Sequence, residues 1–125
     1  MNRKRVLLVD DTETFLYILN HILKDEYETY IAKNGHDALE AAASVKPDLI
    51  LLDVIMPGLS GYDVLKRLKE NPDLKHIPVI MISGNIADES VVTGLSLGAA
   101  DYVKKPFVKN VVKGRIDAVF GNTSD

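Results

Sequence analysis

Short runs of aliphatic and β-branched residues recur along the chain, and each run is typical of a β-strand. The runs at residues 49–52 and 79–82 are apolar at every position, as expected for strands that are covered on both faces of a parallel sheet. We therefore expect these two runs to be central strands. The complete set of expected strands is Arg5–Val9, Glu28–Ala32, Leu49–Leu52, Val79–Ile82 and Tyr102–Lys104.

The longer segments between these runs carry apolar residues at helical spacing. Three segments show the pattern clearly, through Phe15, Leu16, Leu19, Ile22 and Leu23, through Ala38, Leu39, Ala42 and Val45, and through Val64, Leu65 and Leu68. Helices are also expected over Glu89–Leu97 and Asn110–Phe120, although Gly94 and Gly114 each cost about 1 kcal/mol relative to Ala. Five alternations of strand and helix predict an α/β fold, a flavodoxin-like doubly wound parallel sheet of five strands in the order 2-1-3-4-5 with five helices.

Composition narrows the class of protein. The 125 residues suit a single domain, with residues 121–125 expected to form a flexible tail. The formal net charge of −3 lacks the positive excess from which nucleic-acid-binding domains draw their affinity. The absence of cysteine excludes disulfides and thiolate metal sites and favours a cytoplasmic location. The apolar run at residues 6–9 is too short for a secretion signal or a membrane span.

Polar side chains stand at the carboxyl ends of four expected strands. Asp10 and Asp11 follow the first strand, Asp53 follows the third, Ser83 follows the fourth, and residues 104–105 are two lysines at the end of the fifth. In an open α/β sheet, ligands bind beyond the carboxyl ends of the strands, near the point where the winding direction reverses. We therefore expect these side chains to converge on one edge of the sheet.

This combination of side chains has a specific chemistry. Three carboxylates in one pocket raise each other's pKa unless a cation lies among them. Carboxylate oxygens favour a hard divalent ion, and Mg²⁺ usually takes one or two carboxylates, several waters and a phosphate oxygen. A lysine and a serine hydroxyl supply a positive charge and a hydrogen bond for phosphoryl oxygens. The cluster therefore suits phosphoryl transfer to a carboxylate.

Each of these residues also has an ordinary structural interpretation. Asp10 and Asp11 could cap a helix that starts near Glu13, Asp53 could be a turn aspartate, and Ser83 could be a loop serine. Taken singly, these interpretations are preferable. The shared position at the mouths of four different strands favours the functional interpretation.

Four motifs make the chain resemble a receiver domain of the response regulators of two-component signalling, related in fold to the chemotaxis receiver. They are RVLLVDD at Arg5–Asp11, LLDVIMPGLSG at Leu51–Gly61, ISG at Ile82–Gly84 and GAADYVKKPF at Gly98–Phe107. The resemblance spans almost the whole chain. It implies a phosphorylation switch that receives its phosphoryl group from a sensor histidine kinase or phosphotransfer protein. A downstream output domain, a protein partner or a second copy of the chain would then read the change.

The resemblance also implies which residues bind the metal. Asp53 is the phosphoacceptor and a ligand of Mg²⁺, and Asp11 is a direct ligand. Asp10 is a second acidic ligand that acts through water, and the backbone carbonyl of Ile55 is a further contact.

Further roles follow from the same resemblance. Lys105 would hold the phosphoryl oxygens, and it is preferred to Lys104 because it directly precedes Pro106 and because neighbours on a strand point to opposite faces. Ser83 and Tyr102 would form the switch, with Tyr102 swinging inward from a solvent-facing rotamer once a phosphoryl group draws Ser83 toward it. Gly84 would leave the acyl phosphate approachable.

Some positions depart from the family pattern. Ile55 and Asn85 occupy two positions that tune the lifetime of the phosphoryl group, and Ile55 offers no polar side chain to position an attacking water. The last expected helix contains Gly114, has no acidic residue at its start, and has Asn110 as its expected N-cap. The sequence therefore predicts the surface that this helix would present to a partner less specifically than it predicts the phosphorylation site.

Other functions are compatible with the fold. A Mg²⁺-dependent phosphatase of the haloacid dehalogenase type also uses an aspartate nucleophile, but it needs a second aspartate two residues on, where this chain has Ile55. A flavodoxin-like electron carrier would place a flavin phosphate after the first strand, where Asp10 and Asp11 would repel it. A constitutive docking module would not need the acidic cluster. We therefore expect a switch that catalyses its own phosphorylation and dephosphorylation and turns over no external substrate.

Overall fold

The structure is a computed structural model that describes residues 3–84 and 93–121. Five parallel strands form one sheet in the order β2-β1-β3-β4-β5, which confirms the predicted strand order. The strands are β1 (Arg5–Val9), β2 (Glu28–Ala32), β3 (Leu49–Asp53), β4 (Val79–Ser83) and β5 (Asp101–Lys104). The described helices are α1 (Glu13–Leu23), α2 (Gly35–Val45), α3 (Gly61–Glu70) and α5 (Lys109–Phe120), and residues 93–96 are also helical.

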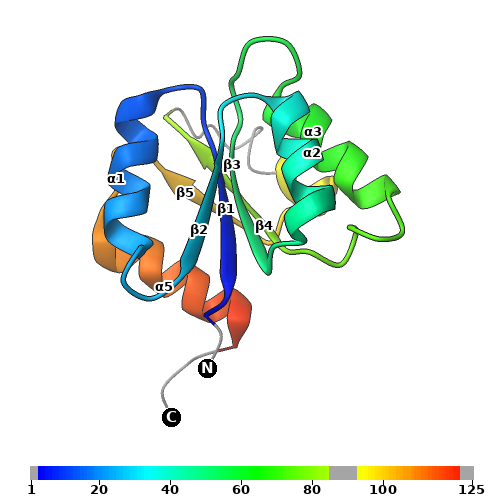
Figure 1. The fold of residues 1–125 in the computed structure, drawn as a ribbon. Helices are drawn as coiled ribbons and strands as arrows, with labels where there is room; N and C mark the ends of the chain where they lie inside the picture. Colours follow the sequence, from blue (N-terminus) through cyan, green and yellow to red (C-terminus); the bar gives the residue numbers. More distant parts are fainter. Residues whose placement is uncertain (1–2, 85–92, 122–125) are drawn as a thin grey trace.

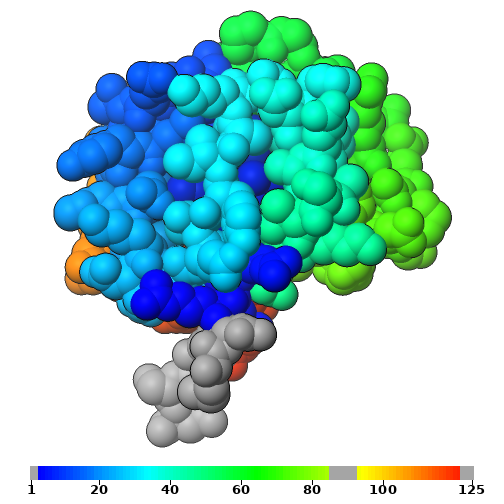
Figure 2. All heavy atoms as spheres, in the orientation of Figure 1, coloured from blue at the N-terminus to red at the C-terminus, as the bar shows by residue number. Residues whose placement is uncertain are grey.

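Helices cover both faces of the sheet. Figure 1 shows α1 and α5 on one face and α2 and α3 on the other, with β2 at the edge nearest the viewer. The space-filling view shows β2, in cyan, at the surface between α1 and α2 (Figure 2). Among the described residues, no helix combines the length and the apolar character that crossing a membrane requires.

The sheet separates two apolar clusters, because successive side chains of a strand point to opposite faces. Every residue of β3 and β4 is buried, as the unbroken apolar runs predicted. On the α2 and α3 side, strand residues such as Leu7, Leu52 and Met81 belong to one buried cluster with Leu65 of α3. On the α1 and α5 side, the alternate strand residues pack instead, among them Leu8, Leu51, Ile80 and Val103.

Two helices begin with side-chain caps that the sequence provides. Ser60 accepts a hydrogen bond from the amide of Asp63, and the Asp63 carboxylate accepts one from the amide of Ser60, which forms a capping box at the start of α3. The Asn34 side chain likewise accepts from the amide of Asp37 at the start of α2. The strand-to-helix connections are therefore fixed locally.

The start of α5 differs from the sequence prediction. Asn110 is not its N-cap, because the helix begins at Lys109 after Val108, and no side chain caps it. The amides of Val111 and Val112 both donate to the carbonyl of Val108, so the N-cap position lies two residues earlier than expected. That register brings Val112 to a fully packed position in the core. The expected absence of an acidic residue in the first turn is confirmed.

Some expectations fall wholly or partly on undescribed residues. The helix expected over Glu89–Leu97 lies partly outside the described residues, and so does Asn85. Of the expected tail at residues 121–125, only Gly121 is described, where it ends α5 with a left-handed φ of 70°.

Candidate functional site

Three aspartates meet at the carboxyl ends of β1 and β3, as the topology predicted. Asp10, Asp11 and Asp53 each place a carboxylate oxygen within 4.8 Å of the others. Asp10 has no exposed surface, Asp53 is 4% exposed, and Asp11 is exposed. The cluster therefore combines two carboxylates inside the protein with one at its surface.

The two oxygens of Asp10 have different surroundings. Oδ1 accepts a hydrogen bond of 3.0 Å from the amide of Thr12, in the turn that leads into α1. Thr12, and neither Asp10 nor Asp11, is the N-cap residue of that helix. Oδ2 is buried and accepts no directed hydrogen bond from the described residues, although it lies 3.0 Å from Nζ of Lys105. A buried carboxylate oxygen without a directed donor, beside two further carboxylates, fits a hard divalent cation such as Mg²⁺.

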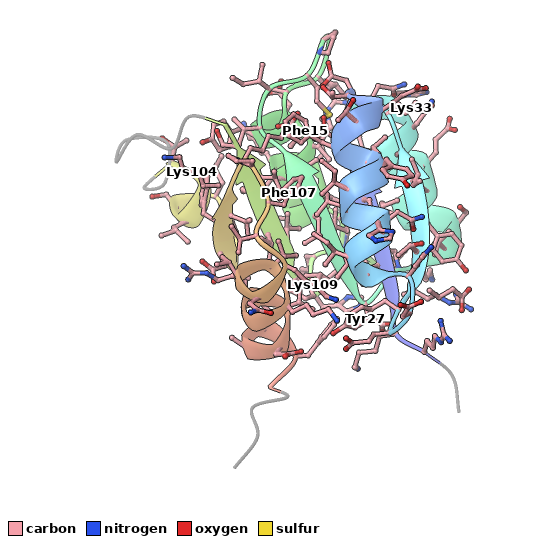
Figure 3. All side chains as sticks on the ribbon, turned by 90° about the vertical axis from the view of Figure 1, so that its left-hand side faces the viewer. Phe15, Tyr27, Lys33, Lys104, Phe107 and Lys109 are labelled. Atoms are coloured by element: carbon pink, nitrogen blue, oxygen red, sulfur yellow. The ribbon has the colours of Figure 1, made fainter. Side chains whose placement is uncertain are left out.

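Lys105 is the lysine that enters the site. Its Nζ lies 3.0 Å from Oδ2 of Asp10 and 3.4 Å from Oδ2 of Asp53, and its side chain is only 12% exposed. Its amide donates to the carbonyl of Ser83, which continues the ladder between β4 and β5, and its peptide bond to Pro106 is cis. Lys104 is exposed, and the side-chain view shows it apart from Phe15 (Figure 3).

The electrostatics of the site act most strongly on Asp53. Burial, and then the negative charge of Asp10, raise the pKa of the Asp53 carboxyl to about 6, while Lys105 opposes the shift. A second positive charge in the cluster would favour the ionised carboxylate.

A cleft of about 500 Å³ opens onto Asp53. Ser83, which is 3% exposed, lines this cleft together with Gly84. A Cβ atom at Gly84 would meet nothing within 4 Å, so the entrance is open at this position. Ile55 also lines the cleft and is 73% exposed.

The chain that follows β3 returns close to the backbone of Asp53 where α3 begins. A Cβ atom at Gly61 would lie 2.1 Å from the carbonyl oxygen of Asp53, so only glycine fits where α3 begins. The amide of Gly61 donates to the carbonyl of Val54, which fixes this return of the chain.

Tyr102 does not face solvent, which corrects the sequence expectation for its starting rotamer. Tyr102 is only 7% exposed, and its hydroxyl shares a hydrogen bond of 2.5 Å with the hydroxyl of Tyr62 on α3. Burial and this hydrogen bond raise the pKa of Tyr102. The inward position is possible because Gly94 leaves space for the ring: a Cβ atom there would lie 2.5 Å from the hydroxyl.

The structure therefore brings Asp10, Asp11, Asp53, Ser83 and Lys105 to one cleft, with Ile55 and Gly84 at its rim. Sequence reasoning missed two aromatic residues. Phe15 lines the same cleft and lies over Lys105, and Tyr62 is the partner of Tyr102. Helical spacing placed Phe15 on the apolar face of α1, but spacing alone cannot place a ring over a lysine from another element.

Comparisons with known proteins agree with this geometry. A family model described as the response regulator receiver domain matches residues 6–117. The alkaline phosphatase synthesis transcriptional regulatory protein PhoP of Bacillus subtilis is 38% identical over 117 residues, which are 93% of this chain and 48% of PhoP. The response regulator PleD of Caulobacter vibrioides is 43% identical over 103 residues, which are 82% of this chain and 23% of PleD.

The fold comparison gives the same result. The chemotaxis protein CheY4 of Vibrio cholerae superimposes with a TM-score of 0.89 at 29% identity, covering 94% of this chain and 98% of CheY4. The chain spans about half of the length of PhoP and about a quarter of the length of PleD.

Proposed function

Because the chain belongs to the family of response regulator receiver domains, we propose that it is a phosphorylation-dependent signalling switch in which Asp53 accepts a phosphoryl group from a histidine kinase or phosphotransfer protein. One observation carries the assignment to these residues. The ammonium of Lys105 lies between the buried carboxylates of Asp10 and Asp53, at the floor of a cleft that is open to a donor.

Asp53 is the nucleophile in this proposal. Burial and Asp10 raise the pKa of its carboxyl, whereas Lys105 favours the ionised form, whose lone pair can attack phosphorus. A bond forms between a carboxylate oxygen and phosphorus as the bond between phosphorus and the donor's imidazole nitrogen breaks. The electron pair of that bond stays on the imidazole nitrogen. The product is an acyl phosphate on Asp53, and no further reactant is needed.

The metal role is assigned to the acidic cluster. Asp11 and Asp53 would hold Mg²⁺ directly, Asp10 would act through water, and the backbone carbonyl of Ile55 would complete the protein ligands. When bound, Mg²⁺ supplies positive charge against the phosphoryl oxygens.

Lys105 and Ser83 would receive the phosphoryl oxygens. Lys105 already carries its charge beside Asp53, so it needs little movement to pair with a phosphoryl oxygen. The buried Ser83 hydroxyl lines the same cleft and can donate to another oxygen. Gly84 keeps the approach free.

The switch would run from Ser83 to Tyr102. A phosphoryl group draws the Ser83 hydroxyl toward Asp53 and favours the inward position of Tyr102, in which its hydroxyl is paired with Tyr62. The inward and outward positions differ at the surface formed by helical residues 93–96, β5 and α5.

The signal would leave through that surface. A hollow of about 570 Å³ lies over β5 and α5, and Val108 and Val111 at its border are 59% and 46% exposed. These apolar side chains suit a downstream output domain, a protein partner or a second copy of the chain. We further propose that residues 1–125 make up one receiver domain. Its β1 begins at Arg5 and its α5 ends at Phe120, close to the limits of the family match.

The phosphatase alternative is not favoured. A phosphatase of the haloacid dehalogenase type needs a second aspartate two residues after its nucleophile. Here that residue is Ile55, which exposes an apolar side chain at the cleft.

Intact-mass measurement tests the proposal. Treatment with phosphoramidate and Mg²⁺ should add the mass of one phosphoryl group to the parent and to Lys104→Ala, and none to Asp53→Ala. Lys105→Ala should add it much more slowly or fail to switch, since its charge is removed from the cleft. A gain of the same mass by Asp53→Ala would show that Asp53 is not the acceptor.

A further inference from the structure

The ring of Phe15 lies over the ammonium of Lys105, and the proposed function gives this contact no role. Nζ of Lys105 is 4.1 Å from the centroid of the ring. Phe15 comes from the first turn of α1, whereas Lys105 follows β5. The contact thus joins two elements across the mouth of the cleft that Phe15 itself lines.

The ring is held by a second aromatic residue. Phe107 meets Phe15 edge to face, with ring centroids 5.6 Å apart and an interplanar angle of 86°. Figure 3 shows both residues on the α1 side of the molecule, at neighbouring positions. Phe107 also packs against the apolar cluster under α1 and α5. The contact with Phe107 therefore fixes the orientation of the Phe15 ring.

Three groups surround the ammonium, and they differ in how they respond to a metal. The carboxylates of Asp10 and Asp53 attract it at 3.0 and 3.4 Å. A divalent cation bound by the acidic cluster would compete for these carboxylates and would repel Lys105. The face of an aromatic ring attracts a cation through its quadrupole, and that attraction does not depend on the charge of the carboxylates.

We propose that Phe15 is a positioning residue for Lys105, whose ring keeps the ammonium in the cleft when a metal occupies the acidic cluster. Lys105 is then ready beside Asp53 when the phosphoryl group arrives. The proposal rests on the proposed function, because it assigns Phe15 to the same site. An aliphatic side chain would fill the space but would not attract the charge.

Fluorination of the Phe15 ring separates attraction from packing. Phenylalanine with one, two or three ring fluorines is to be incorporated at Phe15, since fluorine weakens the ring quadrupole stepwise with little change in volume. The readout is the affinity for beryllofluoride, a phosphoryl mimic, in the presence of Mg²⁺. We expect the affinity to fall at each step, by about threefold to tenfold over the series.

Phe120 provides the matched control. Its ring also carries a lysine, Lys4, with Nζ 4.9 Å from the centroid. This pair lies at the far end of α5, away from the cleft, so the same series at Phe120 should leave the affinity unchanged. Phe15→Trp should retain the affinity of the parent, and Phe15→Leu should lose it, while thermal unfolding shows that both variants fold.

A measurement without metal or mimic tests the geometry by itself. The ring should shift the NMR signals of the ε-methylene protons of Lys105 upfield in the parent, and Phe15→Leu should remove this shift. A parent without the shift, or an affinity that stays constant over the Phe15 series, would overturn the positioning role and leave phosphorylation of Asp53 intact. A parent that shows the shift but takes up neither beryllofluoride nor a phosphoryl group would overturn the proposed function, and with it the role of Phe15 in phosphoryl binding.

Discussion

The surroundings of Asp53 have opposing effects on the pKa of its carboxyl. Burial and the charge of Asp10 disfavour its ionised form, and the ammonium of Lys105 favours it, with the result that its pKa rises from 3.8 to about 6. An acid whose pKa is higher in the folded state than in the unfolded state costs stability when it ionises. The protonated Asp53 carboxyl therefore contributes stability that is fully present below pH 3.8 and is lost as the pH rises through about 6.

Asp53→Asn should therefore stabilise the metal-free protein at neutral pH. The asparagine cannot ionise, so at pH 7.5 the variant should exceed the parent by about 1–3 kcal/mol in free energy of unfolding. The difference should shrink toward pH 4.5, where the parent carboxyl is protonated. Urea unfolding with a chelator present, at both pH values, measures it. A variant that is less stable than the parent at pH 7.5 would contradict the argument.

At the scale of residues, the sequence predicted the positions of the charged side chains better than those of the aromatic rings. The position of Asp10, Asp53 and Lys105 follows from where their strands end, because all parallel strands end at the same edge of the sheet. The inward Tyr102 and the placement of Phe15 over Lys105 depend on side-chain rotation and on contacts between distant elements. No local pattern carries that information.

At the scale of elements, the strands agree with prediction to within one residue at either end. β3 reaches Asp53 and β4 reaches Ser83, so both site residues still belong to the hydrogen-bonded ladder. Unbroken apolar runs are specific because only strands covered on both faces need them. The start of α5 was predicted wrongly, since backbone bonds to the carbonyl of Val108 set it without a side-chain cap.

The contact between residues 93–96 and β5 gives a second prediction. Gly94→Ala places a methyl group 2.5 Å from the Tyr102 hydroxyl oxygen, and the ring can relieve this clash by rotating outward. We expect Gly94→Ala to separate the Tyr102 and Tyr62 rings, seen as a loss of NOE contacts between them, and to lower the stability by about 1–3 kcal/mol.

Gly114→Ala is the matched control for this substitution. It also adds a methyl group to a helical glycine, but that methyl meets nothing within 4 Å, so it should leave Tyr102 in place and stabilise α5 by about 0.5–1 kcal/mol. Unchanged contacts between Tyr102 and Tyr62 in Gly94→Ala would show that another group yields instead.

For the whole molecule, metal binding at one edge should stabilise the entire fold. Asp10 directly follows β1 and Asp53 is the last residue of the adjacent strand β3, so an ion bound there requires both strands to be in place. A ligand that binds only the folded state at ten times its Kd contributes about 1.4 kcal/mol, which corresponds to a rise in Tm of about 5 °C.

Thermal unfolding with increasing Mg²⁺ measures this coupling. We expect the rise in Tm to disappear in Asp53→Ala, and to be weakened more by Asp11→Ala than by Asp10→Ala, because Asp11 is assigned as a direct ligand. Equal losses in the two variants would contradict the distinction between a direct and a water-mediated ligand.

The sheet has a further consequence as a partition between the two apolar clusters. Tyr102 packs with the cluster under α2 and α3, whereas Phe107, which braces Phe15, packs with the cluster under α1 and α5. A change at Lys105 and Asp53 can thus alter side-chain packing separately in the two apolar clusters, because the sheet lies between them. The effects of substitutions on opposite sides of the sheet on the free energy of unfolding should therefore be additive. Each face of the molecule can also evolve its own binding partner that responds to the same phosphorylation.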